Sequence, residues 1–149
     1  MELKIPPPIY MLIFASLMWL LDEFFPIYHW PINTEIFGIC LIITGAAIDF
    51  SSLVGFLISK TTINPMHPEN AHSLVTSGMY HFSRNPMYLG LFFLLFGWSL
   101  YLGALSPLLL LPVFIWVLTK MQIQPEEKIL EGLFGESYVK YKQQVRRWI

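Results

Sequence analysis

Two short groups of polar side chains stand out in an otherwise apolar chain. The first group is Tyr80, Arg84, Asn85 and Tyr88, and the second is the adjacent pair Glu126-Glu127. A cation, an amide, two phenols and two carboxylates can bind a charged, water-soluble ligand, because they offer charge-assisted as well as neutral hydrogen bonds. Apolar sequence lies between the two groups. They therefore suit an encounter between a polar cofactor from the cytosol and an apolar, lipid-like acceptor from a bilayer.

The apolar sequence between the two groups is long enough for two membrane helices. No charged side chain occurs among the 35 residues between Arg84 and Lys120. As one helix they would measure about 50 Å, whereas the hydrocarbon core of a bilayer is about 30 Å thick. The segment from Gly103 to Pro107 offers a turn, with Ser106 as N-cap and Pro107 at the first helical position. The resulting antiparallel hairpin would bring the two polar groups together at one membrane face.

The composition predicts an all-α integral membrane helical bundle. Of 149 residues, 55% are hydrophobic and only 13% are charged, whereas about a quarter of the residues are charged in soluble domains. The apolar blocks predict a single domain over residues 1–149 with spans at about 9–21, 35–58, 86–102 and 107–120. We expect Pro112 to kink the fourth span, Lys120 to end it, and Pro125 to begin new cytosolic helices at about 125–147.

The distribution of Lys and Arg predicts the orientation. These cations gather between residues 60 and 84 and in the tail from residue 120, which places both segments, and both termini, on the cytoplasmic side. The net charge of −1 provides no field that would recruit nucleic acid. Three histidines between residues 60 and 84 lack the spacing of a helical metal pair, so we expect no metal. The single cysteine, Cys40, is interpreted as a small buried side chain.

Asp49 interrupts the second span about 16 Å along the helix from Lys60. An ionisable side chain at that depth is by default a candidate for function. Alternatively, Asp49 caps or pairs within a polar crevice together with Ser51 and Ser52. The small residues Gly38, Gly45 and Gly55 on the same helix predict close approach of a neighbouring helix.

The two polar groups belong to two longer motifs. These are LVTSGxYxxSRNPMYLG at residues 74–90 and EExxLxxxFGxxYxxYxxxVxR at residues 126–147. Together the motifs resemble the isoprenylcysteine carboxyl methyltransferase-like family of integral membrane methyltransferases, and also the related phospholipid N-methyltransferases. The segment Thr62-Ile63-Asn64-Pro65 looks like small bacterial members of the family. The resemblance covers roughly residues 61–149 and implies a location in a bacterial inner membrane.

The resemblance implies methyl transfer from S-adenosylmethionine, bound at the cytosolic end of the hairpin, to a lipophilic acceptor from the membrane. Carboxylates such as Glu126 or Glu127 can bind the ribose hydroxyls or the ammonium of the cofactor, and Arg84 its carboxylate or an anionic acceptor. Arg84 and Glu127 are the catalytic candidates. The cofactor-binding residues correspond here to Gly78, Tyr80, Arg84, Asn85, Pro86, Tyr88, Leu89, Gly90, Glu126, Glu127 and Tyr138.

The sequence departs from the family pattern at one of these positions. Asn85 stands where many members have a histidine, so we assign Asn85 no acid or base role, and we name no general base. We expect Arg84→Ala or Glu127→Gln to abolish cofactor binding and leave the protein folded, since each residue is expected at the surface end of a helix.

Other functions remain open. A phospholipid amine, a thiol or a small isoprenoid could be the methyl acceptor. The alternative that is not an enzyme is a non-catalytic lipid-binding or assembly protein whose basic tail docks on anionic headgroups. For the enzyme, the long loop over residues 60–84 is expected to act as a lid.

Overall fold

The computed structural model describes residues 5–30, 33–58 and 73–149, and within this part of the chain every extended regular element is a helix. Much of the predicted lid, including the segment from Thr62 to Pro65, lies outside the described residues. The elements are α1 (Pro7–Phe24), α2 (Glu35–Ile58), η2 (Gly78–His81), α3 (Pro86–Leu102), η3 (Ser106–Leu109), α4 (Leu110–Leu118), η4 (Thr119–Ile123), α5 (Gln124–Phe134) and α6 (Glu136–Gln144). The predicted all-helical class is confirmed.

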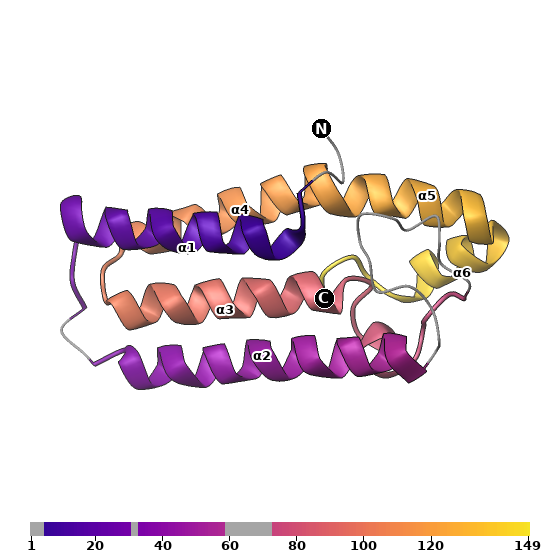
Figure 1. Ribbon diagram of the computed structural model, residues 1–149, viewed down its shortest axis with the longest axis horizontal. Helices are drawn as coiled ribbons and strands as arrows, with labels where there is room; N and C mark the ends of the chain where they lie inside the picture. The colour runs from indigo at the N-terminus through magenta and orange to yellow at the C-terminus, as the bar shows by residue number, and fades with distance from the viewer. Residues whose placement is uncertain (1–4, 31–32, 59–72) are drawn as a thin grey trace.

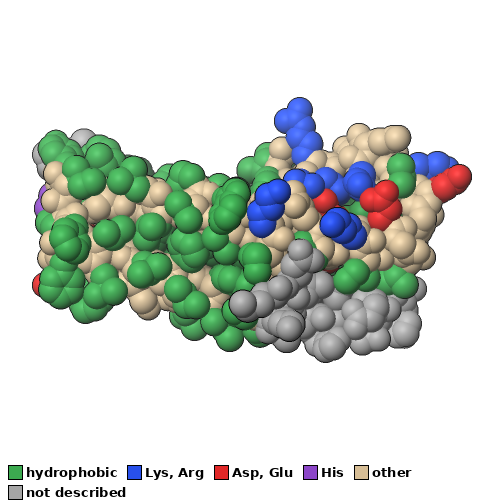
Figure 2. Space-filling view, turned by 90° about the horizontal axis from the view of Figure 1, so that it is seen from above, with side chains coloured by type: hydrophobic (Ala, Val, Ile, Leu, Met, Phe, Trp, Pro, Cys, Tyr) green, Lys and Arg blue, Asp and Glu red, His purple; other side chains and the backbone are tan. Residues whose placement is uncertain are grey.

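The helices form an elongated bundle (Figure 1). In that view α3 lies between α2 on one side and α1 with α4 on the other, while α5 and α6 extend beyond one end. Three described helices are long and apolar enough to cross a membrane, namely 7–24, 35–58 and 106–134, and α3 is a shorter apolar helix. Figure 2 shows hydrophobic side chains over most of the bundle and Lys, Arg, Asp and Glu gathered mainly at the α5–α6 end.

Glycines bring α2 and α3 into direct backbone contact. A Cβ atom on Gly38 would lie 2.5 Å from the Gly97 carbonyl oxygen, and one on Gly45 would lie 2.7 Å from the Gly90 carbonyl oxygen. Gly55 faces the ring of Tyr80 instead of a helix. The close approach fixes the register of α2 against α3, and it confirms the predicted small face at Gly38 and Gly45. Cys40 is exposed on α2, so its predicted burial is wrong.

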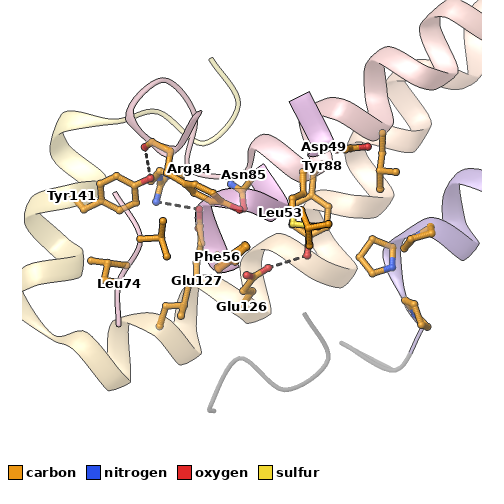
Figure 3. Close-up of a pocket in the computed structure, with 18 of the residues that line it drawn as sticks. Asp49, Leu53, Phe56, Leu74, Arg84, Asn85, Tyr88, Glu126, Glu127 and Tyr141 are labelled. Carbon is orange, nitrogen blue, oxygen red and sulfur yellow. Dashed lines mark hydrogen bonds and ion pairs between the residues drawn. The ribbon is translucent and has the colours of Figure 1, made fainter. Parts of the chain in front are cut away.

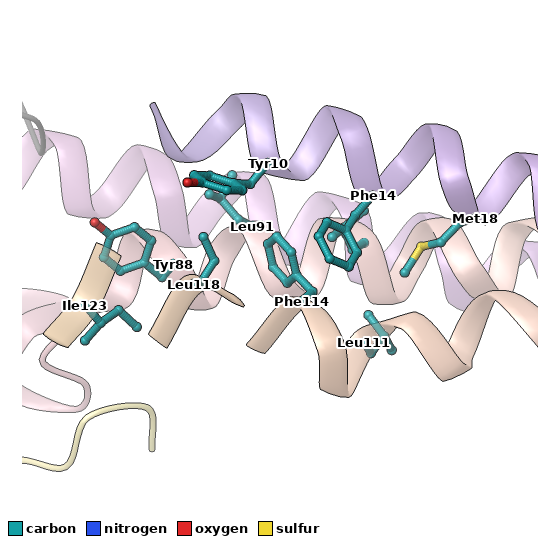
Figure 4. Packing of buried hydrophobic residues seen from close by; sticks show 10 residues of the cluster. Tyr10, Phe14, Met18, Tyr88, Leu91, Leu111, Phe114, Leu118 and Ile123 are labelled. Atoms are coloured by element: carbon teal, nitrogen blue, oxygen red, sulfur yellow. The ribbon is translucent and has the colours of Figure 1, made fainter. Parts of the chain in front are cut away.

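The core lies where α1, α3 and α4 meet (Figure 4). The rings of Phe14 and Phe114 meet edge to face with their centroids 5.2 Å apart. Met18, Leu95 and Leu118 are fully buried around them. This apolar packing holds the hairpin formed by α3 and α4 against α1, and so sets the distance between the start of α3 and the start of α5.

The fourth helix departs from the prediction in three ways. Its N-cap is Leu105, and Ser106 lies inside the 3-10 turn η3, where its hydroxyl donates to the Leu21 carbonyl at 3.5 Å. Pro112 lies in the first turn of α4, where an N–H would have no partner within that helix in any case.

Most importantly, Lys120 does not end the fourth helix. The chain passes through the π-helical turn η4, in which the Gln124 N–H bonds to the Thr119 carbonyl, and continues directly into α5. The wider π turn directly before Pro125 makes room for a proline ring that would collide with a carbonyl in a regular helix. The predicted new helix at Pro125 is therefore a continuation.

The tail folds back on the bundle. α5 ends at Gly135, whose φ of 51° lies in the left-handed region, and α6 follows. After Val145 the chain is extended, and the backbone N–H of Arg84 donates to the Arg146 carbonyl at 3.0 Å. At the far end of the bundle, an isolated β-bridge between His29 and Ala104 joins the loop after α1 to the loop after α3.

Candidate functional site

A cavity of about 670 Å³ opens where α2, the start of α3, α5 and α6 converge. Such a volume is typical of cofactor sites. Figure 3 shows Arg84 and Tyr141 toward one end of the labelled residues and Tyr88 and Asp49 toward the other. The lining includes seven of the predicted site residues, namely Tyr80, Arg84, Asn85, Tyr88, Glu126, Glu127 and Tyr138.

Glu127 is held by two arginines. Arg147 donates from Nε to Oε1 at 3.0 Å and from Nη2 to Oε2 at 2.8 Å, the two-pronged geometry that suits a carboxylate. Arg84 Nη1 lies 3.1 Å from Glu127 Oε1, and the side chains of both residues are only 9% exposed. The hydrogen bonds from Arg147 to Glu127 raise the pKa of the Arg147 guanidinium. Glu127 is therefore a buried ion-pair centre and not a surface group at a helix end.

Arg84 keeps donors for another ligand. Its Nε and Nη1 are buried and have no aligned hydrogen-bond partner among the described residues. Glu127 therefore pairs with the charge of Arg84 without taking up the hydrogen bonds of Nε and Nη1. Buried donors of this kind are costly unless a ligand satisfies them.

The start of α3 is fastened to the tail. The Asn85 side-chain amide donates to the Arg147 carbonyl at 2.9 Å, and the Asn85 N–H donates to the Ser83 hydroxyl at 3.1 Å. Pro86 then begins α3 at a position where a missing N–H costs nothing. Asn85 thus positions the backbone around Arg84, an amide role that needs no titrating group.

Glu126 points into the cavity beside Tyr88. The Tyr88 hydroxyl donates to Glu126 Oε2 at 2.9 Å. No ion pair to Glu126 occurs among the residues that the structure describes. Helix α5 carries Glu126 and Glu127 in its first turn, so the continuous passage from α4 through η4 sets where both carboxylates point. Among the described residues, Glu126 therefore has fewer bonded partners than Glu127.

Three tyrosines form a wall at the α6 end of the cavity. The Tyr141 hydroxyl donates to the Tyr80 carbonyl at 2.6 Å, and Tyr138 packs with Tyr141 and Val145 in one apolar cluster. Burial raises the pKa of Tyr141 to about 12, although nearby Arg84 opposes the shift. Burial also raises the pKa of Tyr80 and Tyr138 above the usual phenol value. The phenols therefore stay neutral donors at ordinary pH.

Four of the predicted cofactor residues do not line the cavity. Gly78 provides a left-handed turn with φ of 62°, Pro86 and Leu89 are buried in α3, and Gly90 packs directly against the Asp49 carboxylate. The structure adds Arg147 and Tyr141 as residues that hold the site together. Both residues are positions of the motif at residues 126–147, and this could have marked them as site residues. The sequence spacing does not indicate that the tail folds back to bring Arg147 to Glu127.

No group of three or more His, Cys, Asp or Glu that could hold a metal occurs within the described segments. Chemically, the cavity offers a guanidinium with free donors, a carboxylate held by one phenol, and neutral phenols beside apolar helix surface. This set can bind a zwitterionic or cationic ligand at one end and an apolar ligand at the other.

Comparisons with known proteins identify the family. The family model described as phospholipid methyltransferase matches residues 33–137. The protein-S-isoprenylcysteine O-methyltransferase of Saccharomyces cerevisiae is 35% identical over 142 residues, covering 89% of this chain and 58% of that protein. Protein-S-isoprenylcysteine O-methyltransferase B of Arabidopsis thaliana is 32% identical over 117 residues, covering 78% of this chain and 58% of its own length.

A third relative, an uncharacterised protein of Haemophilus influenzae, is 46% identical over 63 residues and is covered completely, although the match spans 42% of this chain. The chain thus spans somewhat more than half the length of the two isoprenylcysteine methyltransferases that it matches. The family model covers most of the chain, including both polar groups. This chain belongs to the phospholipid methyltransferase family, within the isoprenylcysteine carboxyl methyltransferase-like group.

Proposed function

We propose that this protein transfers a methyl group from S-adenosylmethionine to a lipophilic acceptor at the cytoplasmic face of a membrane. The observation that carries the proposal is a single cavity with a polar end, at Arg84 and Glu126, and an apolar end between α2 and α3. Family membership supports the methyl-transfer chemistry. A cavity with these two ends can hold a charged donor and an apolar acceptor side by side, and such positioning accounts for much of the rate of a displacement reaction.

The residues at the polar end fit the cofactor. The buried Nε and Nη1 donors of Arg84 suit its carboxylate, and Glu126, bonded by Tyr88 among the described residues, suits its ammonium or ribose hydroxyls. When bound, S-adenosylmethionine supplies an electrophilic methyl group on a sulfonium. Because Glu127 already binds two arginines, we assign it the role of orienting Arg84 and keep Glu126 and Tyr88 as the direct cofactor contacts.

The surface and the helix lengths support a membrane placement for the proposed enzyme. α3 lies inside the bundle between the longer helices and has 17 residues, about 25 Å at 1.5 Å per residue. We therefore take it as a fourth span, with the charged end seen in Figure 2 in the cytosol together with both termini. α5 and α6 then form the cytosolic part of one membrane domain.

The acceptor shares an apolar tail with the substrates that the relatives' names indicate, an isoprenylcysteine or a phospholipid. A direct test supplies S-adenosylmethionine labelled in its methyl group to the purified protein in liposomes. The acceptors are an S-farnesyl thioether and a phospholipid. We expect label in the organic extract that depends on protein and is lost when product S-adenosylhomocysteine is added in excess. Label that stays entirely in the aqueous phase for every acceptor would contradict methyl transfer to a lipophilic acceptor.

A further inference from the structure

A run of prolines at the start of α1 lines one side of the cavity, and a buried glutamine holds it there. Pro6, Pro7 and Pro8 are lining residues, and Gln122 bonds to the residue just before them. We propose that Gln122 is a positioning residue for the acceptor, because it fixes this proline segment as a wall for the acceptor's apolar part. The inference rests on the proposed function, and it concerns residues outside the two sequence motifs at 74–90 and 126–147.

The proline segment and α2 form the two sides of the apolar end. α3 lies between α1 and α2 in the bundle (Figure 1), and its Leu91 lines the cavity. Figure 3 shows the start of α1 on the Tyr88 side of the cavity, away from Arg84. Pro8 on α1 and Phe50 on α2 both line the cavity and are exposed. An apolar tail in this end therefore lies over α3, with the proline segment on one side and α2 on the other.

The two sides are held by different contacts. α2 is fixed against α3 by the direct backbone approach of Gly45 and Gly90. On the other side, α1 begins at Pro7 after Pro6, which makes no side-chain capping bond. Consecutive prolines have no backbone N–H to donate, so the segment cannot be fastened by donors of its own. It depends on a donor that reaches its carbonyl groups from elsewhere in the fold.

Gln122 is such a donor. Its Nε2 donates to the Ile5 carbonyl at 2.9 Å, across 117 positions of the chain. The Gln122 side chain is fully buried, and its Oε1 has no hydrogen-bond partner among the described residues. A buried amide with an unsatisfied atom costs stability, and an apolar side chain of similar size would avoid that cost. The bond to Ile5 is what glutamine provides at this position and an apolar side chain would not.

The π turn η4 gives Gln122 a rigid base. Ile123 in the same turn is buried in the core together with Tyr10 of α1, and Ile5 packs against this core. Glu126 follows four positions after Gln122, in the first turn of α5. Because Ile123 holds the turn independently of the amide, loss of the Gln122 bond should release the proline segment and leave Glu126 in place. Acceptor binding should then change without a change in cofactor binding.

The test measures these two affinities separately by calorimetric titration in detergent. S-adenosylhomocysteine is titrated into the protein, and the saturated protein is then titrated with N-acetyl-S-farnesylcysteine or dihexanoyl phosphatidylethanolamine. The variants are compared with the probe that binds the native protein more tightly.

Gln122→Met keeps the side-chain length and suits apolar surroundings, but it removes the donor. We expect it to weaken probe binding by between about twofold and tenfold, the range for one hydrogen bond, with unchanged affinity for S-adenosylhomocysteine. In turnover with labelled donor, the KM for the acceptor should rise while kcat stays nearly constant.

Pro8→Asp tests the wall itself. Aspartate is favoured in the first turn of a helix, so α1 can still form, but the new charge faces the apolar tail. We expect probe binding to weaken by at least about tenfold. Ile9→Asp is the matched control, because Ile9 is exposed and does not line the cavity, and it should leave probe affinity unchanged. In a double variant with Gln122→Met the wall is already displaced, so Pro8→Asp should cost clearly less than it does alone.

The outcomes separate the inference from the proposed function. Equal losses from Pro8→Asp and Ile9→Asp, or losses that simply multiply in the double variant, would overturn the inference while the proposed function stands. A Gln122→Met protein that loses S-adenosylhomocysteine affinity as strongly as probe affinity would also overturn it, because Gln122 would then support the turn before Glu126. The Pro8 and Ile9 variants keep the wall testable even if Gln122→Met does not fold. Native protein that binds neither probe would instead contradict the proposed lipophilic acceptor.

Discussion

The two ends of the cavity handle a buried carboxylate in opposite ways. At the polar end, Glu127 receives two hydrogen bonds from Arg147 and an ion pair from Arg84. At the apolar end, Asp49 has a buried oxygen with no partner among the described residues. The difference teaches that burial of a charge does not by itself mark a ligand site. Glu127 is part of the framework, whereas the described residues provide no partner for Asp49 Oδ1.

The two ends are also held together by different forces. Ion pairs and backbone hydrogen bonds fasten the tail, α5 and the start of α3 at the polar end. At the apolar end, direct glycine contacts hold α2 against α3. Ion pairs are sensitive to loss of one partner, and glycine contacts to added volume, so different substitutions should disturb each end.

The largest effect should come from Glu127→Gln. It leaves the buried Arg84 guanidinium and the partly exposed Arg147 guanidinium without their anion, so we expect a loss of about 3 kcal/mol in the free energy of unfolding, together with weaker cofactor binding. Asp49→Asn removes a carboxylate whose Oδ1 atom has no hydrogen-bond partner among the described residues, and it should not lower stability. Denaturant unfolding in detergent, followed by tryptophan fluorescence, compares the two variants. Equal destabilisation of both would remove the distinction between the paired carboxylate of Glu127 and that of Asp49.

A smaller effect is expected from Gly97→Ala. Its Cβ atom would lie 2.5 Å from the Gly38 carbonyl oxygen, so α2 and α3 must separate, at a cost of about 1–3 kcal/mol. Gly132→Ala is the matched control, because nothing lies within 4 Å of a Cβ atom there. Thermal unfolding in one detergent measures both. A Gly97→Ala protein as stable as the control would show that glycine contact does not hold the apolar end.

The smallest effect concerns alkaline pH at the tyrosine wall. The pKa of Tyr141 is about 12 in the folded protein, mainly through burial, above the unfolded value of 10.0. The folded state therefore retains a proton that the unfolded state loses, and stability falls as pH rises from about 10 to about 12. Tyr141→Phe should lower stability at neutral pH, since the Tyr80 carbonyl loses its donor, and should flatten this alkaline decline. An unchanged decline would exclude Tyr141 as its source.

Much of the architecture could be predicted because it depends on local chemistry. Long uncharged blocks specify apolar helices, and the α2 and α3 bounds, residues 35–58 and 86–102, follow from the flanking polar and turn residues. Gly135 ends α5 because it adopts a left-handed conformation, which a sequence can indicate. The glycines on α2 likewise predicted the close approach of a neighbouring helix, which α3 makes at Gly38 and Gly45.

The errors at Pro125 and at Glu127 have a common physical cause. In each case the same residues are compatible with two different local structures. Pro125 can begin a helix or follow a π turn within one, and the structure has the second, with Ile123 of the π turn packed into the core. Arg147 belongs to a tail whose charges are also suited to lipid headgroups. Its partner Glu127 becomes evident only once the extended segment after α6 returns to the start of α3.

The most direct test of a cofactor site at the polar end is calorimetric titration of the purified protein in detergent with S-adenosylmethionine and S-adenosylhomocysteine. The informative variant is Glu126→Gln, because glutamine keeps an acceptor for the Tyr88 hydroxyl and removes only the charge. Glu131→Gln is the control on the same helix, where the carboxylate bonds to Lys142 at 2.8 Å in a largely exposed pair. We predict saturable binding to the native protein and to Glu131→Gln, and at least about tenfold weaker binding to Glu126→Gln. Equal affinity in all three proteins, or no binding to the folded native protein, would contradict the assignment of this cavity to the cofactor.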